Sequence, residues 1–95
     1  MEKELQNIII RPVLSEKTTR LRDLYNIYCF EVAKYATKHD IKEAFKKIYN
    51  VTVEKCNIVN VRGKKKRRRF IEGRTRSWKK VYVRLKQGEK LDIGI

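Results

Sequence analysis

The residues best suited to chemistry in this 95-residue chain form one basic segment at positions 62–80. Eleven Lys and Arg residues face one acid there, Glu72, so the segment holds +10 of the chain's net charge of +14. Such cations bind phosphate groups and release the counterions condensed on a nucleic acid. The candidate RNA-binding residues are these cations, two aromatic residues within the segment and one lysine outside it: Arg62, Lys64, Lys65, Lys66, Arg67, Arg68, Arg69, Phe70, Arg74, Arg76, Trp78, Lys79, Lys80 and Lys38.

A run of charge is also typical of a solvated face or a disordered tail. This run, however, is internal, has apolar stretches on both sides, and contains Phe70, Ile71 and Trp78. Crowded like charges repel one another, and a polyanionic partner relieves that repulsion. No zinc finger, basic zipper or RNA-recognition-sheet signature is present, so the sequence gives little support for sequence-specific DNA binding. We therefore expect the partner to be RNA of fixed shape. Two compatible roles stay open for Trp78, which could stack on an unpaired base or anchor the last strand in the core.

No constellation of catalytic residues is evident. His39 is the only histidine, and it stands among charged neighbours. Ser15 and Ser77 have no basic partner nearby, the acids are scattered singly, and the glycines match no phosphate-binding loop. We therefore expect no enzyme activity, no cofactor, no metal and no small-molecule substrate.

The composition indicates a protein of the cell interior. No apolar run approaches the ~18–20 residues that span a bilayer, and the mixed charges of the first five residues do not suggest a secretory signal. Cys29 and Cys56 lie in apolar stretches without ligand spacing. A disulfide is formally possible, but we expect two reduced thiols that fill the core.

Hydrophobic periodicity predicts the elements that must position the basic segment. Pro12 disfavours helix before it, and Ser15 is suited to cap a following helix, whose first turn Glu16 would stabilise through the helix dipole. Thr37 and Asp40 suggest a capping box, and Asn50 a helix end. The predicted elements are an extended stretch at 8–14, a helix at 16–24, a strand at 25–32 with one buried face, a helix at 37–50 burying Ile41, Ala44, Phe45, Ile48 and Tyr49, a strand at 51–61 with a bulge or a change of buried face near Cys56, a strand at 79–87, and a short edge at 91–93.

This order predicts one α+β domain over residues 1–95. Its antiparallel sheet would have three to four strands packed with helices. The strands that flank the basic segment would form a long hairpin, with residues 62–80 projecting from the globular body as its loop.

Four stretches resemble, in order, the bacterial type of ribosomal protein twenty-three family (universal uL23 family) of the large subunit. They are IRPVLSEK at 10–17, VAKYATK at 32–38, VEKCNIVNVRGK at 53–64 and WKKVYVRLKQG at 78–88. The resemblance covers residues 8–93 in one register. One departure is Ser77, where the family often has an acidic residue.

The resemblance implies a structural constituent of the large ribosomal subunit, located in the cytoplasm on the ribosome. The family binds large-subunit ribosomal RNA near the peptide tunnel exit, beside neighbouring ribosomal proteins. It also offers a docking site for trigger factor and signal recognition particle, which by motif falls on Ser15, Glu16 and Lys17. From the residues alone, Glu16 is equally explained as a helix-dipole residue.

Two other functions fit the charge pattern. One is a free-standing RNA-binding or RNA-chaperone module, which would bind many RNAs alike. The other is a protein-interaction or membrane-surface module that uses the same basic segment on acidic partners.

Overall fold

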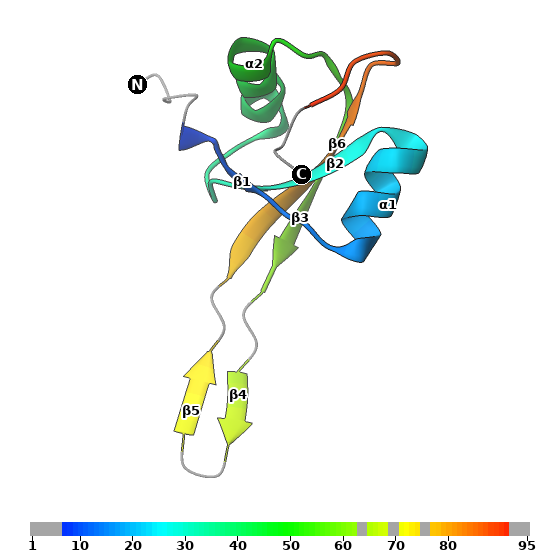
Figure 1. The fold of residues 1–95 in the computed structure, drawn as a ribbon. Helices are drawn as coiled ribbons and strands as arrows, with labels where there is room; N and C mark the ends of the chain where they lie inside the picture. Colours follow the sequence, from blue (N-terminus) through cyan, green and yellow to red (C-terminus); the bar gives the residue numbers. More distant parts are fainter. Residues whose placement is uncertain (1–6, 63–64, 69–70, 75–76, 92–95) are drawn as a thin grey trace.

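The computed structural model describes residues 7–62, 65–68, 71–74 and 77–91, and for 65–68 and 71–74 it describes the backbone alone. Figure 1 shows an antiparallel sheet with a helix on each side and a narrow hairpin running away from it. The elements are β1 (Ile9–Pro12), α1 (Glu16–Tyr25), β2 (Ile27–Val32), α2 (Lys38–Tyr49), β3 (Val53–Val61), β4 (Lys65–Arg68), β5 (Ile71–Arg74) and β6 (Trp78–Leu85).

The main sheet has four strands in the order β1-β2-β6-β3, and each neighbouring pair is antiparallel. A second ladder joins β4 to β5. The predicted α+β class and the hairpin of two flanking strands are therefore confirmed. The predicted bulge lies slightly earlier than expected, between Val53 and Lys55, because Cys56 already pairs in register with Val83.

The helix boundaries follow from local capping. The Thr37 hydroxyl accepts a hydrogen bond from the Asp40 N–H at 3.2 Å, and the Asp40 carboxylate accepts one from the Thr37 N–H at 3.0 Å. Ser15 caps α1 through a similar capping box. Both helices end at an asparagine in the left-handed region, Asn26 with φ 58° and Asn50 with φ 55°. The predicted caps at Ser15 and Thr37 and the predicted end at Asn50 are confirmed.

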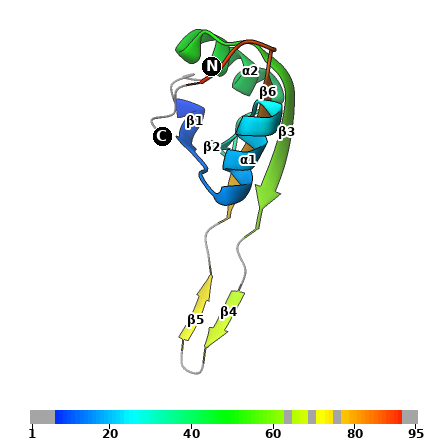
Figure 2. The same ribbon diagram turned by 45° about the vertical axis from the view of Figure 1, so that its right-hand side comes forward.

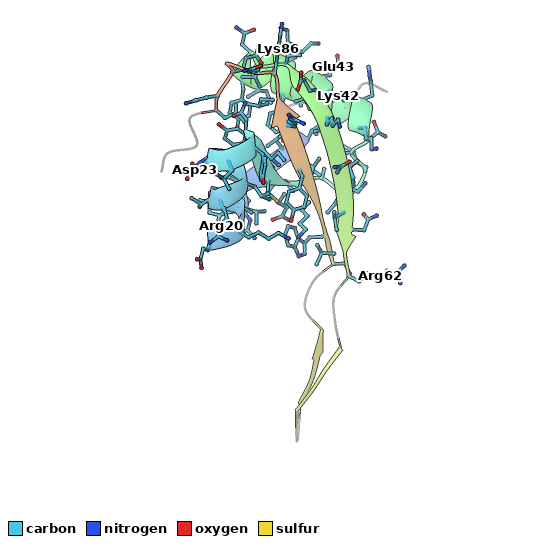
Figure 3. The ribbon with its side chains drawn as sticks, turned by 90° about the vertical axis from the view of Figure 1, so that its right-hand side faces the viewer. Arg20, Asp23, Lys42, Glu43, Arg62 and Lys86 are labelled. Carbon is cyan, nitrogen blue, oxygen red and sulfur yellow. The ribbon has the colours of Figure 1, made fainter. Side chains whose placement is uncertain are left out.

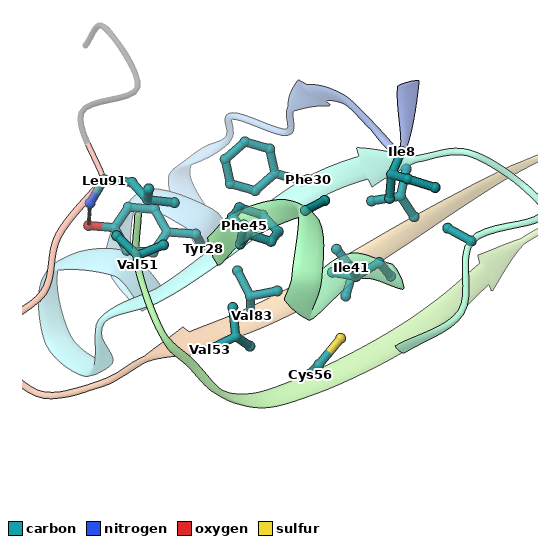
Figure 4. Close-up of a cluster of buried hydrophobic side chains, with 14 of the residues drawn as sticks. Ile8, Tyr28, Phe30, Ile41, Phe45, Val51, Val53, Cys56, Val83 and Leu91 are labelled. Atoms are coloured by element: carbon teal, nitrogen blue, oxygen red, sulfur yellow. Dashed lines mark hydrogen bonds between the residues drawn. The ribbon is translucent and has the colours of Figure 1, made fainter. Parts of the chain in front are cut away.

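The core lies between α2 and the sheet, as Figure 4 shows. Ile41, Ala44 and Phe45 are buried, and the Phe45 ring meets Phe30 of β2 edge-on with 5.1 Å between centroids. On the strands, the core includes Tyr28, Phe30, Val32, Val53, Cys56, Val81, Val83 and Leu85.

One part of the predicted α2 face is wrong. Ile48 and Tyr49 are 45% and 39% exposed, although they share the helical face of Ile41 and Phe45. The helical period decides the side of a helix on which a residue lies. It does not decide how far the neighbouring strands extend under that side, so the last turn of α2 is only partly covered.

The prediction of a single buried face on β2 is also wrong. Residues 28–32 are all buried, including Cys29 and Glu31 on the face opposite Phe30. The reason is that α1 packs on this second face of β2. Cys29 lies beside Val13, Thr18 and Thr19 there.

The C-terminal segment after β6 returns to the body. Gly88 adopts φ +90° in the turn, and the Leu91 N–H donates to the Tyr28 hydroxyl at 3.1 Å (Figure 4). Leu91 is buried but belongs to no strand, and the other two residues of the predicted edge, Asp92 and Ile93, lie outside the described residues. Across the described part of the chain, no helix is long and apolar enough to cross a membrane.

Candidate nucleic-acid interface

The basic segment extends the hairpin formed by β3 and β6. These strands pair up to Val61 and Trp78, and further out Lys65 pairs with Arg74 and Arg68 with Ile71. The second ladder projects away from both helices in two views (Figures 1 and 2). It lengthens the molecule to 51 Å along its main axis and gives a radius of gyration of 15.1 Å. A compact domain of this length has about 12 Å.

The sequence predicted a long hairpin with a projecting basic loop, and within that projection the described backbone at 65–68 and 71–74 forms a two-stranded ladder. The ladder has a simple cause, since the strands at its base already run antiparallel, which favours the antiparallel pairing of β4 with β5. It places Lys65, Lys66, Arg67 and Arg68 consecutively on one strand and Arg74 on the other. Lys64, Arg69, Phe70 and Arg76 lie outside the described residues.

The base of the hairpin is held by the body. Trp78 is partly buried at the first position of β6. Lys79 is also partly buried, and its ammonium donates a hydrogen bond to the Ala36 carbonyl at 3.0 Å. Two of its three donors are not used by that bond. Lys80 lies with its Nζ 5.3 Å from the centre of the Tyr82 ring, a cation–π geometry.

The structure places two further predicted residues, one close to this base and one apart from it. Arg62 is exposed at the end of β3, where the strands leave the body (Figure 3). Lys38 is exposed at the start of α2, which packs on the opposite side of the sheet from Lys80. The structure therefore groups Arg62, Trp78 and Lys80 near the hairpin base and leaves Lys38 on a helix.

Sequence reasoning missed a group of residues on the side of the sheet away from the core. Register pairs Lys55 with Arg84 and Asn57 with Tyr82. Because Cys56 pairs with Val83 in the core, strand alternation puts all four of these residues on the opposite face. The alternation of these four residues with core residues could be seen in the sequence. Their exposure could not, because it depends on where α1 packs, which is on β2.

The two thiols lie on opposite faces of the sheet and are both free and buried. Burial raises the pKa of Cys29 and of Cys56 above the ordinary 9.0, and nearby lysines offset part of that rise. Both are therefore neutral, and their free and buried state agrees with the predicted reduced thiols, although only Cys56 lies in the core between α2 and the sheet. Among the described residues, no cluster of His, Cys, Asp or Glu could hold a metal ion.

The predicted docking residues occupy the first turn of α1. The Ser15 hydroxyl is used in the helix cap, where it accepts from the Thr18 N–H at 3.2 Å. The Glu16 side chain is 93% exposed and lies 3.8 Å from Arg20. An open depression of about 600 Å³ lies here, lined by Ser15, Glu16, Lys17, Arg20, Leu21, Leu24 and Tyr25.

Comparison with known proteins gives a consistent result. Residues 7–93 match the family model described as "Ribosomal protein L23". The chain is 52% identical over 90 residues to a protein of Treponema denticola, which covers 95% of both chains. A Thermotoga neapolitana protein is 51% identical over 84 residues, or 88% of this chain and 83% of its own. A Saccharophagus degradans protein is 44% identical over 93 residues, or 98% and 95%. All three are named "Large ribosomal subunit protein uL23".

Proposed function

This chain belongs to the ribosomal protein L23 family, and on that premise we propose that its basic hairpin binds large-subunit ribosomal RNA. A protein of this family is a component of the large ribosomal subunit and is not an enzyme. Its place is on the ribosome, which in bacteria lies in the cytoplasm. Its partners there are ribosomal RNA and neighbouring ribosomal proteins.

The observation that carries the RNA proposal is the projecting ladder with its row of cations. Lys65, Lys66, Arg67 and Arg68 are consecutive on β4, so at about 3.3 Å per residue their backbone positions lie within roughly 10 Å of one another. Both strands of the ladder are anchored through β3 and β6, which reduces the conformational entropy lost on binding. Arg62 and Lys80 extend the charge to the body.

Neutralising the hairpin tests this role. Replacing every residue from Lys64 to Arg69 by Gln is expected to lower the slope of log affinity against log salt by about 4–5, because each phosphate contact contributes about 0.7–0.9. The fold should persist, since the core is formed by α2 and the main sheet. The slope is measured by binding to large-subunit ribosomal RNA at several salt concentrations. A thermal melt of the same variant measures whether the fold persists.

A variant of equal charge serves as the control. It changes six exposed lysines of the body to Gln, namely Lys34, Lys42, Lys46, Lys47, Lys86 and Lys90. If this variant loses as much affinity as the hairpin variant, binding depends on total charge and the hairpin has no special role. Affinity unchanged in the hairpin variant would overturn the proposal directly.

We also propose that the start of α1 is a docking site at the peptide tunnel exit, used by trigger factor, with signal recognition particle docking nearby. Three observations support this part. The Glu16 carboxylate is almost fully exposed, and Leu24 and Tyr25 are 64% and 59% exposed further along the same helix. The depression beside Glu16 contains those same two apolar residues.

Glu16→Ala is expected to weaken trigger factor binding to ribosomes about five- to tenfold, which corresponds to the loss of one solvent-exposed hydrogen bond of ~1–1.4 kcal/mol. Its ribosomal RNA affinity should not change. Glu43→Ala is the matched control, because it removes the same charge from α2, outside the depression beside Glu16. Chaperone occupancy that is equal in the two variants would remove Glu16 from the docking site.

A further inference from the structure

The face of the main sheet away from the core is covered by α1 over β2, and neither helix covers the part over β3 and β6. On β3 this part presents Lys55, Asn57 and Val59, and on β6 it presents Lys80, Tyr82 and Arg84, which pair across the ladder. We call these six residues the open face. On β3 all three are exposed, and on β6 Arg84 is exposed while Lys80 and Tyr82 are partly buried. The reason is that α1 packs on β2, the next strand, and does not extend over β3.

The open face is polar and positively charged. Three of its six residues are cations and none is an acid. Glu54 lies at its rim, 4.0 Å from Arg84, in an ion pair whose two side chains are each about half exposed. Such a pair is weak and easily exchanged for a phosphate. Glu31, the neighbour of Lys80 on β2, is buried and already binds Arg11 at 2.8 Å.

This composition favours one kind of partner. The cores of protein–protein interfaces are depleted in lysine and rich in apolar and aromatic residues. Here Val59, at 39% exposure, is the only aliphatic side chain of the six. Lys55 and Arg84, by contrast, lie directly opposite each other and expose both cations at one point of the ladder. Paired cations suit a phosphate backbone.

The open face is also continuous with the hairpin. Its two strands, β3 and β6, are those that lead outward to β4 and β5 (Figure 3). An RNA that contacts the hairpin can therefore continue along the same strands onto the body. Tyr82 keeps the Lys80 ammonium in place at this junction through their 5.3 Å contact.

We propose that the open face is a second RNA-binding surface, on which Lys55 and Arg84 bind phosphate groups and the Asn57 amide hydrogen-bonds the ribose or a base edge. The proposal rests on the ribosomal RNA binding proposed above. It adds a contact on the globular body that is independent of the hairpin cations.

The test is Lys55→Gln combined with Arg84→Gln, in the full chain with its hairpin intact. Loss of two phosphate contacts should lower the salt slope by about 1.5 and weaken affinity for large-subunit ribosomal RNA roughly tenfold near 0.15 M salt. Lys42→Gln with Lys86→Gln is the matched control, because these exposed lysines lie at the end of the sheet away from the hairpin (Figure 3). An equal loss in the two double variants would overturn the proposal.

The outcome separates this proposal from the one on which it rests. If the hairpin variant loses binding while the Lys55 and Arg84 variant behaves as wild type, the hairpin binds RNA and the open face does not. If the wild-type chain does not prefer ribosomal RNA at all, the proposed function itself fails.

A photo-crosslinking residue at Asn57 identifies the occupant in assembled large subunits. An adduct with ribosomal RNA supports the proposal. An adduct with a neighbouring protein, or none in subunits that contain the variant, contradicts it.

Discussion

The Arg11–Glu31 pair joins two residues in very different surroundings. The Arg11 Nε lies 2.8 Å from the Glu31 Oε1, yet the Arg11 side chain is 65% exposed and that of Glu31 only 5%. A buried charge without its partner is more destabilising than an exposed one, because the exposed group is hydrated by water. The two residues should therefore differ in their contribution to stability.

Arg11→Ala is expected to lower the free energy of unfolding by about 1–3 kcal/mol, since it removes a charged hydrogen bond from a buried carboxylate. Glu31→Gln keeps the shape and leaves Arg11 in water, so its effect should be smaller, about 1 kcal/mol or less. Urea denaturation of both variants at neutral pH makes the comparison. A larger loss in Glu31→Gln would contradict this asymmetry.

Helix α2 is the element whose ends are most directly set by single residues. Thr37 and Asp40 cap its start, and Asn50 stops it with φ 55°. Only glycine and, less easily, asparagine adopt that conformation at low cost. The burial of Ile41 and Phe45 then fixes the helix on the sheet that supports the hairpin.

Asn50→Gly should change the free energy of unfolding by no more than about 0.5 kcal/mol, whereas Asn50→Val should lower it by about 1–2 kcal/mol, because a β-branched side chain is strained at positive φ. Asn57→Val is the matched control. Asn57 is an exposed strand residue without positive φ, and valine is favoured in strands. Equal losses at positions 50 and 57 would show that the left-handed conformation is not what stops the helix.

These elements also show what sequence can predict. Caps and helix ends depend on neighbours within four residues, so Thr37, Asp40 and Asn50 could be identified directly. The exposure of Ile48 and the burial of Glu31 could not, because each depends on which distant element lies beside it. The open face could not be predicted from sequence for the same reason, although Tyr82 and Arg84 clearly alternate with core residues.

The whole molecule consists of two parts, a globular body and a projecting hairpin, and they differ in charge. The segment at 62–80 holds +10 of the net charge of +14; within it, the described residues 65–68 and 71–74 form the projecting ladder, and 78–80 form the start of β6. The body holds the core and, in α1, the proposed docking surface. The charge distribution could be read from sequence, whereas the two-stranded path of the hairpin and its extension along β3 and β6 required the structure.

The most direct test of the central claim is a salt titration of the affinity of the purified chain for large-subunit ribosomal RNA, beside an unrelated structured RNA of equal length. With ~6–8 hairpin charges engaged, the slope of log affinity against log salt should be roughly −4 to −7 for both. We expect tighter binding to the ribosomal RNA at every salt concentration, because phosphate contacts alone do not discriminate and RNA shape does. Equal affinities for the two RNAs would contradict the account and favour a general RNA-binding module.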